Sequence, residues 1–269
     1  MTGDNCPMTD RRRTGAEEGS ALMGMDGTDR KTAVVTGASR GIGAGIARAL
    51  AEAGYNLSLC CEKNTEKLEQ LACELEQEYG TAVLTMAADV SDFASVKEFH
   101  RRTAERFGTA DVVVNNAGIS HIGLLCDMSE EEWNRILSVN LSSCFYTAKL
   151  FVPDMVRRRS GHLIQISSMW GSRGASCEVA YSAAKGGMEA FTRALAKELA
   201  PSNVAVNAIA CGVIETDMNA QFSDEERKAL VEEIPADRFG TPGEVGSCVV
   251  SLLSMPYVTG QIIGVDGGI

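Results

Sequence analysis

The chain has 269 residues, of which 45% are hydrophobic and 23% charged, a composition typical of one large globular α/β domain. Its formal net charge of −11 argues against a nucleic-acid partner, because an acidic surface repels phosphate backbones. The sequence has no apolar run long enough to span a membrane and no metal-ligand spacing among its nine Cys and three His, so we expect a cytoplasmic protein with reduced thiols and no metal site.

The chain divides into a polar leader and one periodic domain. Residues 1–30 lack hydrophobic periodicity, which predicts a disordered leader, or residues upstream of a start at Met23 or Met25. Over residues 31–269, apolar runs alternate with helical patterns. The predicted strands are Thr32–Thr36, Leu57–Cys61, Val83–Ala87, Asp111–Asn115, Leu163–Ser167, Val204–Ile209 and Ile262–Val265. The predicted helices are Gly41–Ala53, Thr65–Tyr79, Val96–Phe107, Ser129 towards Arg158, Val179–Leu199, and two shorter ones that begin at Ser223 and Pro242.

This alternation predicts the fold class. Strand–helix repetition along a whole domain indicates a parallel sheet, and continuous apolar strands indicate that helices cover both of its faces. We therefore expect a single Rossmann-type, doubly wound domain with a seven-stranded parallel sheet. In such sheets ligands bind beyond the carboxyl ends of the strands, so the residues that follow each strand are the candidates for function.

A glycine-rich turn follows the first predicted strand and leads into a helix. Gly37 permits a tight turn, Gly41 allows the backbone to approach a pyrophosphate, and Gly43 allows close packing of helix and strand. The start of the helix offers free N–H groups and the positive end of its dipole to phosphates. The turn, which also contains Ser39, Arg40 and Ile42, therefore predicts a dinucleotide site.

The spacing G-x-x-x-G-x-G in Thr36–Gly43 resembles the cofactor loop of the short-chain dehydrogenase/reductase family, and the resemblance covers nearly all of residues 31–269. By this resemblance Asp89 lies beside the adenine. The segment Asn115–Gly118 resembles the family's structural N-N-A-G. Further cofactor contacts that the resemblance implies are those of Asn116, Ala117, Gly118, Ile214 and Thr216.

The choice between NADP and NAD depends on charges after the second strand. NAD enzymes place a carboxylate there for the ribose 2′-hydroxyl, whereas NADP enzymes use cations for the 2′-phosphate. By the resemblance, the position of that carboxylate falls on Cys61. Arg40 and Lys63 favour a 2′-phosphate and Glu62 opposes it. We expect NADPH rather than NADH.

Tyr181 and Lys185 are the candidate catalytic pair. They lie four residues apart on a predicted helix and so share one face. A nearby ammonium and the oxidised nicotinamide stabilise the phenolate of such a tyrosine and lower its pKa, so that it can act as general acid in reduction and general base in oxidation. Within the family resemblance, Ser168 matches the serine that holds the substrate carbonyl, and Ser167 is the adjacent alternative, for which we rather expect a structural role. Asn140 matches an asparagine that binds a water beside the lysine and completes a proton relay to solvent; taken alone, it is better explained as a helix residue that satisfies a backbone group.

One position departs from the family pattern. After the sixth strand the family usually has Pro-Gly, whereas this chain has Cys211-Gly212. Losing the proline removes a constraint on φ, which puts the rigidity of this loop in doubt but not the chemistry.

Two substrate classes remain open. Much of the chain, including Tyr257–Gln261, resembles bacterial 3-oxoacyl-[acyl-carrier-protein] reductases, for which a homotetramer is implied. The stretches Ser167–Gly171 and Gly174–Val179 resemble a narrower group that reduces the 5-aminopentanone modification of elongation factor P. Glu178 suits a substrate ammonium, although it equally suits a helix start. A non-catalytic dinucleotide sensor is a remote third interpretation, disfavoured because both Tyr181 and Lys185 are present.

Overall fold

The computed structural model describes residues 30–216 and 223–269, so the predicted leader lies outside the described residues except for Arg30. The described chain forms one seven-stranded sheet in the order β3-β2-β1-β4-β5-β6-β7, with every neighbouring pair parallel. The predicted fold class is confirmed. The strands are β1 Thr32–Thr36, β2 Asn56–Cys61, β3 Val83–Ala87, β4 Val112–Asn115, β5 Gly161–Ser168, β6 Val204–Cys211 and β7 Ile262–Val265.

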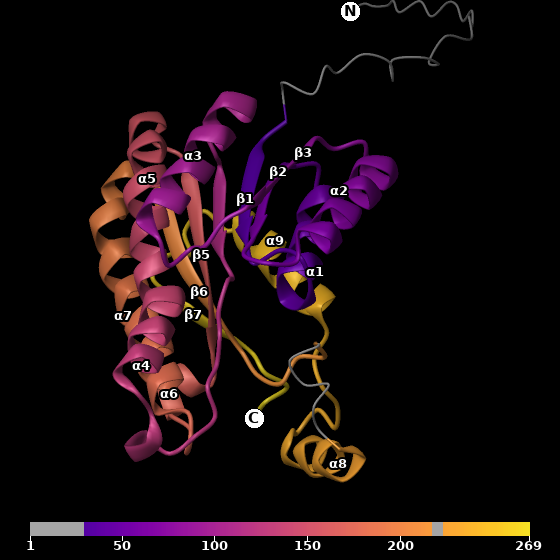
Figure 1. Cartoon of the computed structure of the whole chain (residues 1–269). Helices are drawn as coiled ribbons and strands as arrows, with labels where there is room; N and C mark the ends of the chain where they lie inside the picture. The colour runs from indigo at the N-terminus through magenta and orange to yellow at the C-terminus, as the bar shows by residue number, and fades with distance from the viewer. Residues whose placement is uncertain (1–29, 217–222) are drawn as a thin grey trace, which may run out of the picture.

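Helices cover both faces of the sheet (Figure 1). The helices are α1 Gly41–Glu52, α2 Thr65–Tyr79, α3 Phe93–Phe107, α4 Glu130–Leu137, α5 Ser143–Arg158, α6 Trp170–Arg173, α7 Val179–Leu199, α8 Asp224–Glu233 and α9 Pro242–Leu253, with short turns η1 Leu125–Asp127, η2 Ser138–Ser142 and η3 Ala200–Ser202. Helices α1, α2 and α9 pack on one face, and α3, α5 and α7 on the other. None of the helices described here is long and apolar enough to cross a membrane.

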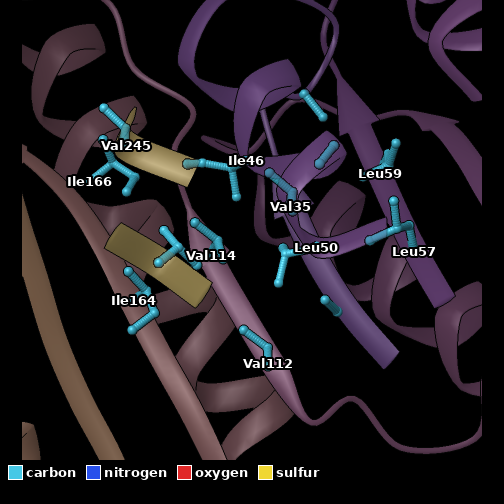
Figure 2. Close-up of a cluster of buried hydrophobic side chains, with 14 of the residues drawn as sticks. Val35, Ile46, Leu50, Leu57, Leu59, Val112, Val114, Ile164, Ile166 and Val245 are labelled. Atoms are coloured by element: carbon cyan, nitrogen blue, oxygen red, sulfur yellow. The ribbon is translucent and has the colours of Figure 1, made fainter. Parts of the chain in front are cut away.

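The core follows from the alternation of side chains along the strands. In β1, Val35 faces α1 and α9 while Val34 faces the opposite layer of helices. Figure 2 shows the first of these layers, where Ile46 and Leu50 of α1 meet the valines and isoleucines of β4 and β5. Both faces of the sheet are apolar, which is why its strands appear in the sequence as continuous hydrophobic runs.

Two local features differ from the sequence prediction. The single helix predicted from Ser129 to Arg158 is interrupted by a π-helical turn, η2, between α4 and α5. Its predicted beginning is confirmed, because Ser129 and Glu132 form a capping box. The short helix α6 after β5 was not predicted, since four residues are too few to show a helical period.

The strand that ends at Cys211 explains how the chain tolerates the missing proline. β6 extends to Cys211, two residues beyond the prediction, and Cys211 pairs with Ser168 of β5. The Cys211 carbonyl accepts a hydrogen bond from the Met169 N–H at 2.9 Å, and the Gly212 N–H donates to the Val265 carbonyl at 3.0 Å. Strand pairing on both sides therefore holds this position where a proline would have restricted it.

Candidate active site

A cleft of about 690 Å³ opens at the carboxyl ends of the strands, as expected for an open α/β sheet. It is lined by the segments that follow β1 to β6. Every site residue predicted from the sequence lines this cleft except Asn140. The predicted residues brought together there are Gly37, Ser39, Arg40, Gly41, Ile42, Gly43, Lys63, Asp89, Asn116, Ala117, Gly118, Ser168, Tyr181, Lys185, Ile214 and Thr216.

The glycine turn is a narrow cradle between β1 and α1. Gly37 and Gly41 have φ of +65° and +56°, a region that side-chain-bearing residues rarely adopt. A Cβ at Gly43 would lie 2.3 Å from the Gly37 carbonyl oxygen, so only glycine allows α1 to approach the turn. The first turn of α1 is thereby directed at the cleft, where its N–H groups suit a pyrophosphate.

Asn116 and Thr36 hold this cradle in place. The Asn116 side-chain amide donates to the carbonyls of Thr36 at 2.9 Å and Gly37 at 3.0 Å. The Thr36 hydroxyl accepts from the N–H groups of Asn116 and Ala117. These contacts tie the end of β1 to the end of β4. Sequence reasoning anticipated a structural role for Asn116 but missed Thr36, whose partners lie about eighty residues away.

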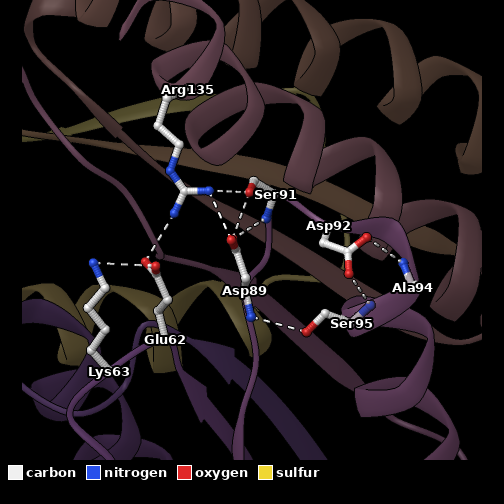
Figure 3. A network of polar contacts seen from close by, with 8 residues as sticks. All are labelled: Glu62, Lys63, Asp89, Ser91, Asp92, Ala94, Ser95 and Arg135. Carbon is white, nitrogen blue, oxygen red and sulfur yellow. Dashed lines mark hydrogen bonds and ion pairs between the residues drawn. The ribbon is translucent and has the colours of Figure 1, made fainter. Parts of the chain in front are cut away.

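Acidic side chains at the far end of the cleft meet an arginine that the sequence analysis did not identify (Figure 3). Asp89, which follows β3, accepts hydrogen bonds from the Ser91 N–H and hydroxyl and from Arg135 of α4. Burial raises the pKa of Asp89, but these hydrogen bonds outweigh it, so the pKa is lowered overall. Arg135 also donates a hydrogen bond of 3.1 Å to Glu62, the residue that follows β2. The Glu62 carboxylate lies 3.5 Å from Lys63.

Tyr181 and Lys185 project from α7 towards the end of β5. The Lys185 ammonium lies 5.5 Å from the centroid of the Tyr181 ring and donates to the Ile166 carbonyl at 2.7 Å. The Ser168 hydroxyl is hydrogen-bonded to that of Tyr181. Ser167 instead donates to the buried Glu189, which fits the structural role expected of it. Ser168, Tyr181 and Lys185 therefore form one polar cluster in the wall of the cleft.

Burial governs the titration of this cluster in the chain by itself. Loss of hydration raises the pKa of Tyr181 to about 12, and the hydrogen bond with Ser168 lowers it only in part. Burial lowers the pKa of Lys185. The lowering that we expect from the ammonium together with the oxidised nicotinamide concerns the site with cofactor bound, whereas in the chain by itself desolvation dominates. Tyr181 is accordingly a neutral phenol at pH 7, which is the form that can donate a proton.

Asn140 lies behind the cleft on the π-helical turn. Its side chain is fully buried, donates to the Ile119 carbonyl at 2.8 Å and accepts from the Ile119 N–H at 3.0 Å. A Cβ at Gly118 would lie 2.7 Å from its side-chain oxygen. Asn140 thus fixes the chain that follows β4, which is the backbone-satisfying role considered for it above.

Glu178 occupies the N-cap position of α7, without a side-chain capping hydrogen bond, and lines the cleft. Loss of hydration raises its pKa. Across residues 30–216 and 223–269, its carboxylate has no hydrogen-bonding or ion-pairing partner. In the same described part of the chain, no cluster of His, Cys, Asp or Glu could hold a metal ion.

Comparison with known proteins places this geometry among oxidoreductases. A family model described as short chain dehydrogenase matches residues 31–227. The uncharacterized oxidoreductase YmfI of Bacillus subtilis is 39% identical over 240 residues, which cover 88% of this chain and 98% of that protein. The 3-oxoacyl-[acyl-carrier-protein] reductase FabG of Chlamydia muridarum is 40% identical over 88% of this chain and 96% of its own. A crystal structure of a candidate short-chain alcohol dehydrogenase from Sinorhizobium meliloti matches with a TM-score of 0.84 and 37% identity, covering 88% of this chain and 95% of that one.

Proposed function

Because the chain belongs to the short-chain dehydrogenase/reductase family and is an NAD(P)-dependent oxidoreductase, we propose that it uses NADPH to reduce the ketone of a 3-oxoacyl group carried on acyl carrier protein. The observation that carries this proposal is the cluster of Ser168, Tyr181 and Lys185 in the wall of a cleft that also contains the glycine cradle. A ketone bound there lies between a proton donor and a dinucleotide site.

The cofactor site fits a dinucleotide on this chain's own geometry. The cradle at Gly37, Gly41 and Gly43 leaves room where any side chain would collide, and the start of α1 presents N–H groups to phosphates. Asp89 and the backbone of Asn116–Gly118 would hold the adenosine half, and Ile214 and Thr216 the carboxamide end. When bound, the reduced nicotinamide supplies a hydride to the carbonyl carbon.

Three side chains handle the proton and the oxygen. Ser168 donates a hydrogen bond to the substrate carbonyl and stabilises negative charge on its oxygen. Tyr181, a neutral phenol at pH 7, transfers its proton to that oxygen, so that the ketone becomes a secondary alcohol. Lys185 stabilises the phenolate that remains. Because Ile119 engages the side-chain amide of Asn140, that side chain is not available for the water expected beside Lys185.

The preference for NADPH rests on the charges beside the end of β2. Cys61, which takes the place of a ribose-binding carboxylate, is a buried neutral thiol, and burial raises its pKa. Arg40 and Lys63 line the rim of the cleft, where a 2′-phosphate would find cations.

The test is consumption of NADPH by the purified protein with an acetoacetyl thioester. We expect turnover with NADPH and a lower rate with NADH. Absence of turnover with the thioester, together with turnover on elongation factor P that carries the 5-aminopentanone group, would refute the carrier-protein proposal.

A second substrate class is favoured by one observation. Glu178 is a half-buried carboxylate that lines the cleft and has no partner in the described parts of the chain. A partly desolvated carboxylate gains most from a cation, and the 5-aminopentanone modification of elongation factor P ends in an ammonium. The alternative proposal is therefore reduction of this aminoketone, with elongation factor P as the protein partner.

Glu178→Gln separates the two substrates. Activity on the aminoketone should fall by about tenfold to a hundredfold, as expected for the loss of a charge-assisted hydrogen bond. Activity on the thioester should hold or rise. Glu198→Gln, an exposed position at the other end of α7, is the matched control and should change neither rate. If Glu178→Gln leaves the ratio of the aminoketone and thioester activities unchanged, Glu178 has no role in substrate choice and only begins the helix.

The cytoplasmic location and the homotetramer implied by the family resemblance are further parts of the proposal. Mass measurement of the purified protein in solution tests the homotetramer, and a stable monomer would refute it.

A further inference from the structure

Two carboxylates at the adenosine end of the cleft share one guanidinium. Arg135 of α4 contacts Asp89 at 2.9 Å through one nitrogen and Glu62 at 3.1 Å through another, and the first nitrogen also contacts the Ser91 hydroxyl (Figure 3). Asp89 and Glu62 line the cleft, whereas Arg135 does not. Arg135 therefore binds both carboxylates without itself lining the cleft.

This position determines the charge that a cofactor meets. Glu62 directly follows the strand whose end distinguishes NAD from NADP enzymes. An unpaired carboxylate there would repel a 2′-phosphate. Besides Arg135, the cation next to Glu62 is Lys63, which neutralises the Glu62 charge only in part. The Lys63 ammonium lies 3.5 Å from Glu62, and its side chain is 80% exposed, so solvent screens the attraction. The Arg135 contact is shorter and involves side chains that are 37% and 40% exposed.

We propose that Arg135 is a specificity-determining residue for the cofactor: it neutralises Glu62 and holds it in place, so that a ribose bearing a 2′-phosphate is accepted beside it. The proposal rests on the proposed use of NADPH. Arg135 acts through Glu62 and is a positioning residue, since it does not line the cleft. The planar guanidinium is suited to this task because its separate N–H groups can bind two carboxylates at once.

The effect of Arg135 on Glu62 can be separated from its effect on Asp89. By the family resemblance Asp89 would lie beside the adenine, which NADH and NADPH share, so a disturbance of Asp89 should change both dissociation constants alike. Glu62 directly follows the strand end that distinguishes the two cofactors. The ratio of the dissociation constant of NADH to that of NADPH therefore reports the Glu62 effect alone.

The experiment measures both dissociation constants by cofactor fluorescence, without substrate, in full-length variants. In Arg135→Gln we expect the ratio to fall about tenfold, which corresponds to about 1.4 kcal/mol. In Glu62→Gln/Arg135→Gln, which lacks the exposed carboxylate as well, the ratio should return to within about threefold of the wild type. Arg101→Gln, which removes another arginine with two glutamate partners on the distant helix α3, should leave the ratio unchanged.

Three results would overturn the proposal. They are an unchanged ratio in Arg135→Gln, a double variant whose ratio stays as low as that of Arg135→Gln, and a fall of the ratio in Glu62→Gln alone. The last measurement also decides the matter if Arg135→Gln fails to fold. A wild-type ratio below one would refute the proposed use of NADPH instead, and the shift between variants would still report on Arg135.

Discussion

Gly43→Ala places one methyl group where α1 meets the cofactor turn. The added Cβ would lie 2.3 Å from the Gly37 carbonyl oxygen and 2.6 Å from the Asn116 side-chain nitrogen, whereas ordinary contacts begin at 3.4 Å. Either α1 or the turn must therefore move by about 1 Å. Neither neighbour is a flexible side-chain end, because the Asn116 amide is itself bonded to the Gly37 carbonyl at 3.0 Å.

The size of the effect follows from these contacts. Overpacking costs about 1–3 kcal/mol, and loss of the Asn116 hydrogen bond adds about 0.5–1.5 kcal/mol. The better helix propensity of alanine returns up to about 1 kcal/mol. We expect a net destabilisation of about 0.5–4.5 kcal/mol. The dissociation constant for NADPH should be at least about tenfold higher, because the displaced turn is the cofactor cradle.

Thermal unfolding and cofactor fluorescence measure both effects. Gly243→Ala in the first turn of α9 is the matched control, since the nearest atom to its added Cβ is 3.9 Å away. That variant should be as stable as the wild type or slightly more stable, with normal NADPH binding. If Gly43→Ala unfolds at the wild-type temperature and binds NADPH normally, the cradle is less rigid than its contacts indicate and the reasoning fails.

Three further predictions concern the catalytic and cofactor residues. Tyr181→Phe should lower turnover at least about a hundredfold with little change in NADPH affinity; near-normal turnover would refute the proton-donor role. Arg40→Ala and Lys63→Ala should each weaken NADPH binding by about tenfold and NADH binding less, and equal weakening of both cofactors would count against the proposed 2′-phosphate contacts. Since an unfolded tyrosine ionises near pH 10 and Tyr181 only near its raised pKa of about 12, the wild type should lose about 1–3 kcal/mol of stability relative to Tyr181→Phe as the pH rises between these values, as measured by denaturant unfolding. An identical pH dependence in the two proteins would contradict that pKa.

Local patterns were sufficient to predict most of the fold. The sheet is buried on both faces, so each strand from Thr32–Thr36 to Ile262–Val265 appears as an apolar run between turn or helix signals. The capping boxes at Ser129 and Ser223 fixed two helix starts from short-range hydrogen bonds alone. The π-helical turn was not predictable in this way. It depends on the Asn140 side chain bonding to Ile119, a contact made across twenty-one residues.

In the candidate site, too, residues in short-range patterns were predictable from the sequence and residues that depend on long-range contacts were not. Short motifs are recognisable because their residues lie close together in the sequence and therefore also in the fold. Examples are the glycines of the cradle and the pair of Tyr181 and Lys185. Arg135 carries no such signal, since its partners Asp89 and Glu62 are 46 and 73 residues away and a single arginine on an amphipathic helix resembles any solvent-exposed cation. The rise of the Tyr181 pKa in the chain by itself was not predictable for a related reason. It depends on how much water the fold removes, which residue spacing does not report.

That pKa bears on the form in which Tyr181 begins the reaction. For oxidation of an alcohol, Tyr181 has to begin as a phenolate, the form that the Lys185 ammonium and a bound oxidised nicotinamide would stabilise. For reduction it begins as the neutral phenol that is already present, and the nearby Lys185 ammonium stabilises the phenolate only as the proton leaves. Interactions that strengthen towards the transition state are those that accelerate a reaction. Tyr181 therefore begins ketone reduction in the protonated form that can donate to the ketone oxygen, whichever ketone the cleft accepts.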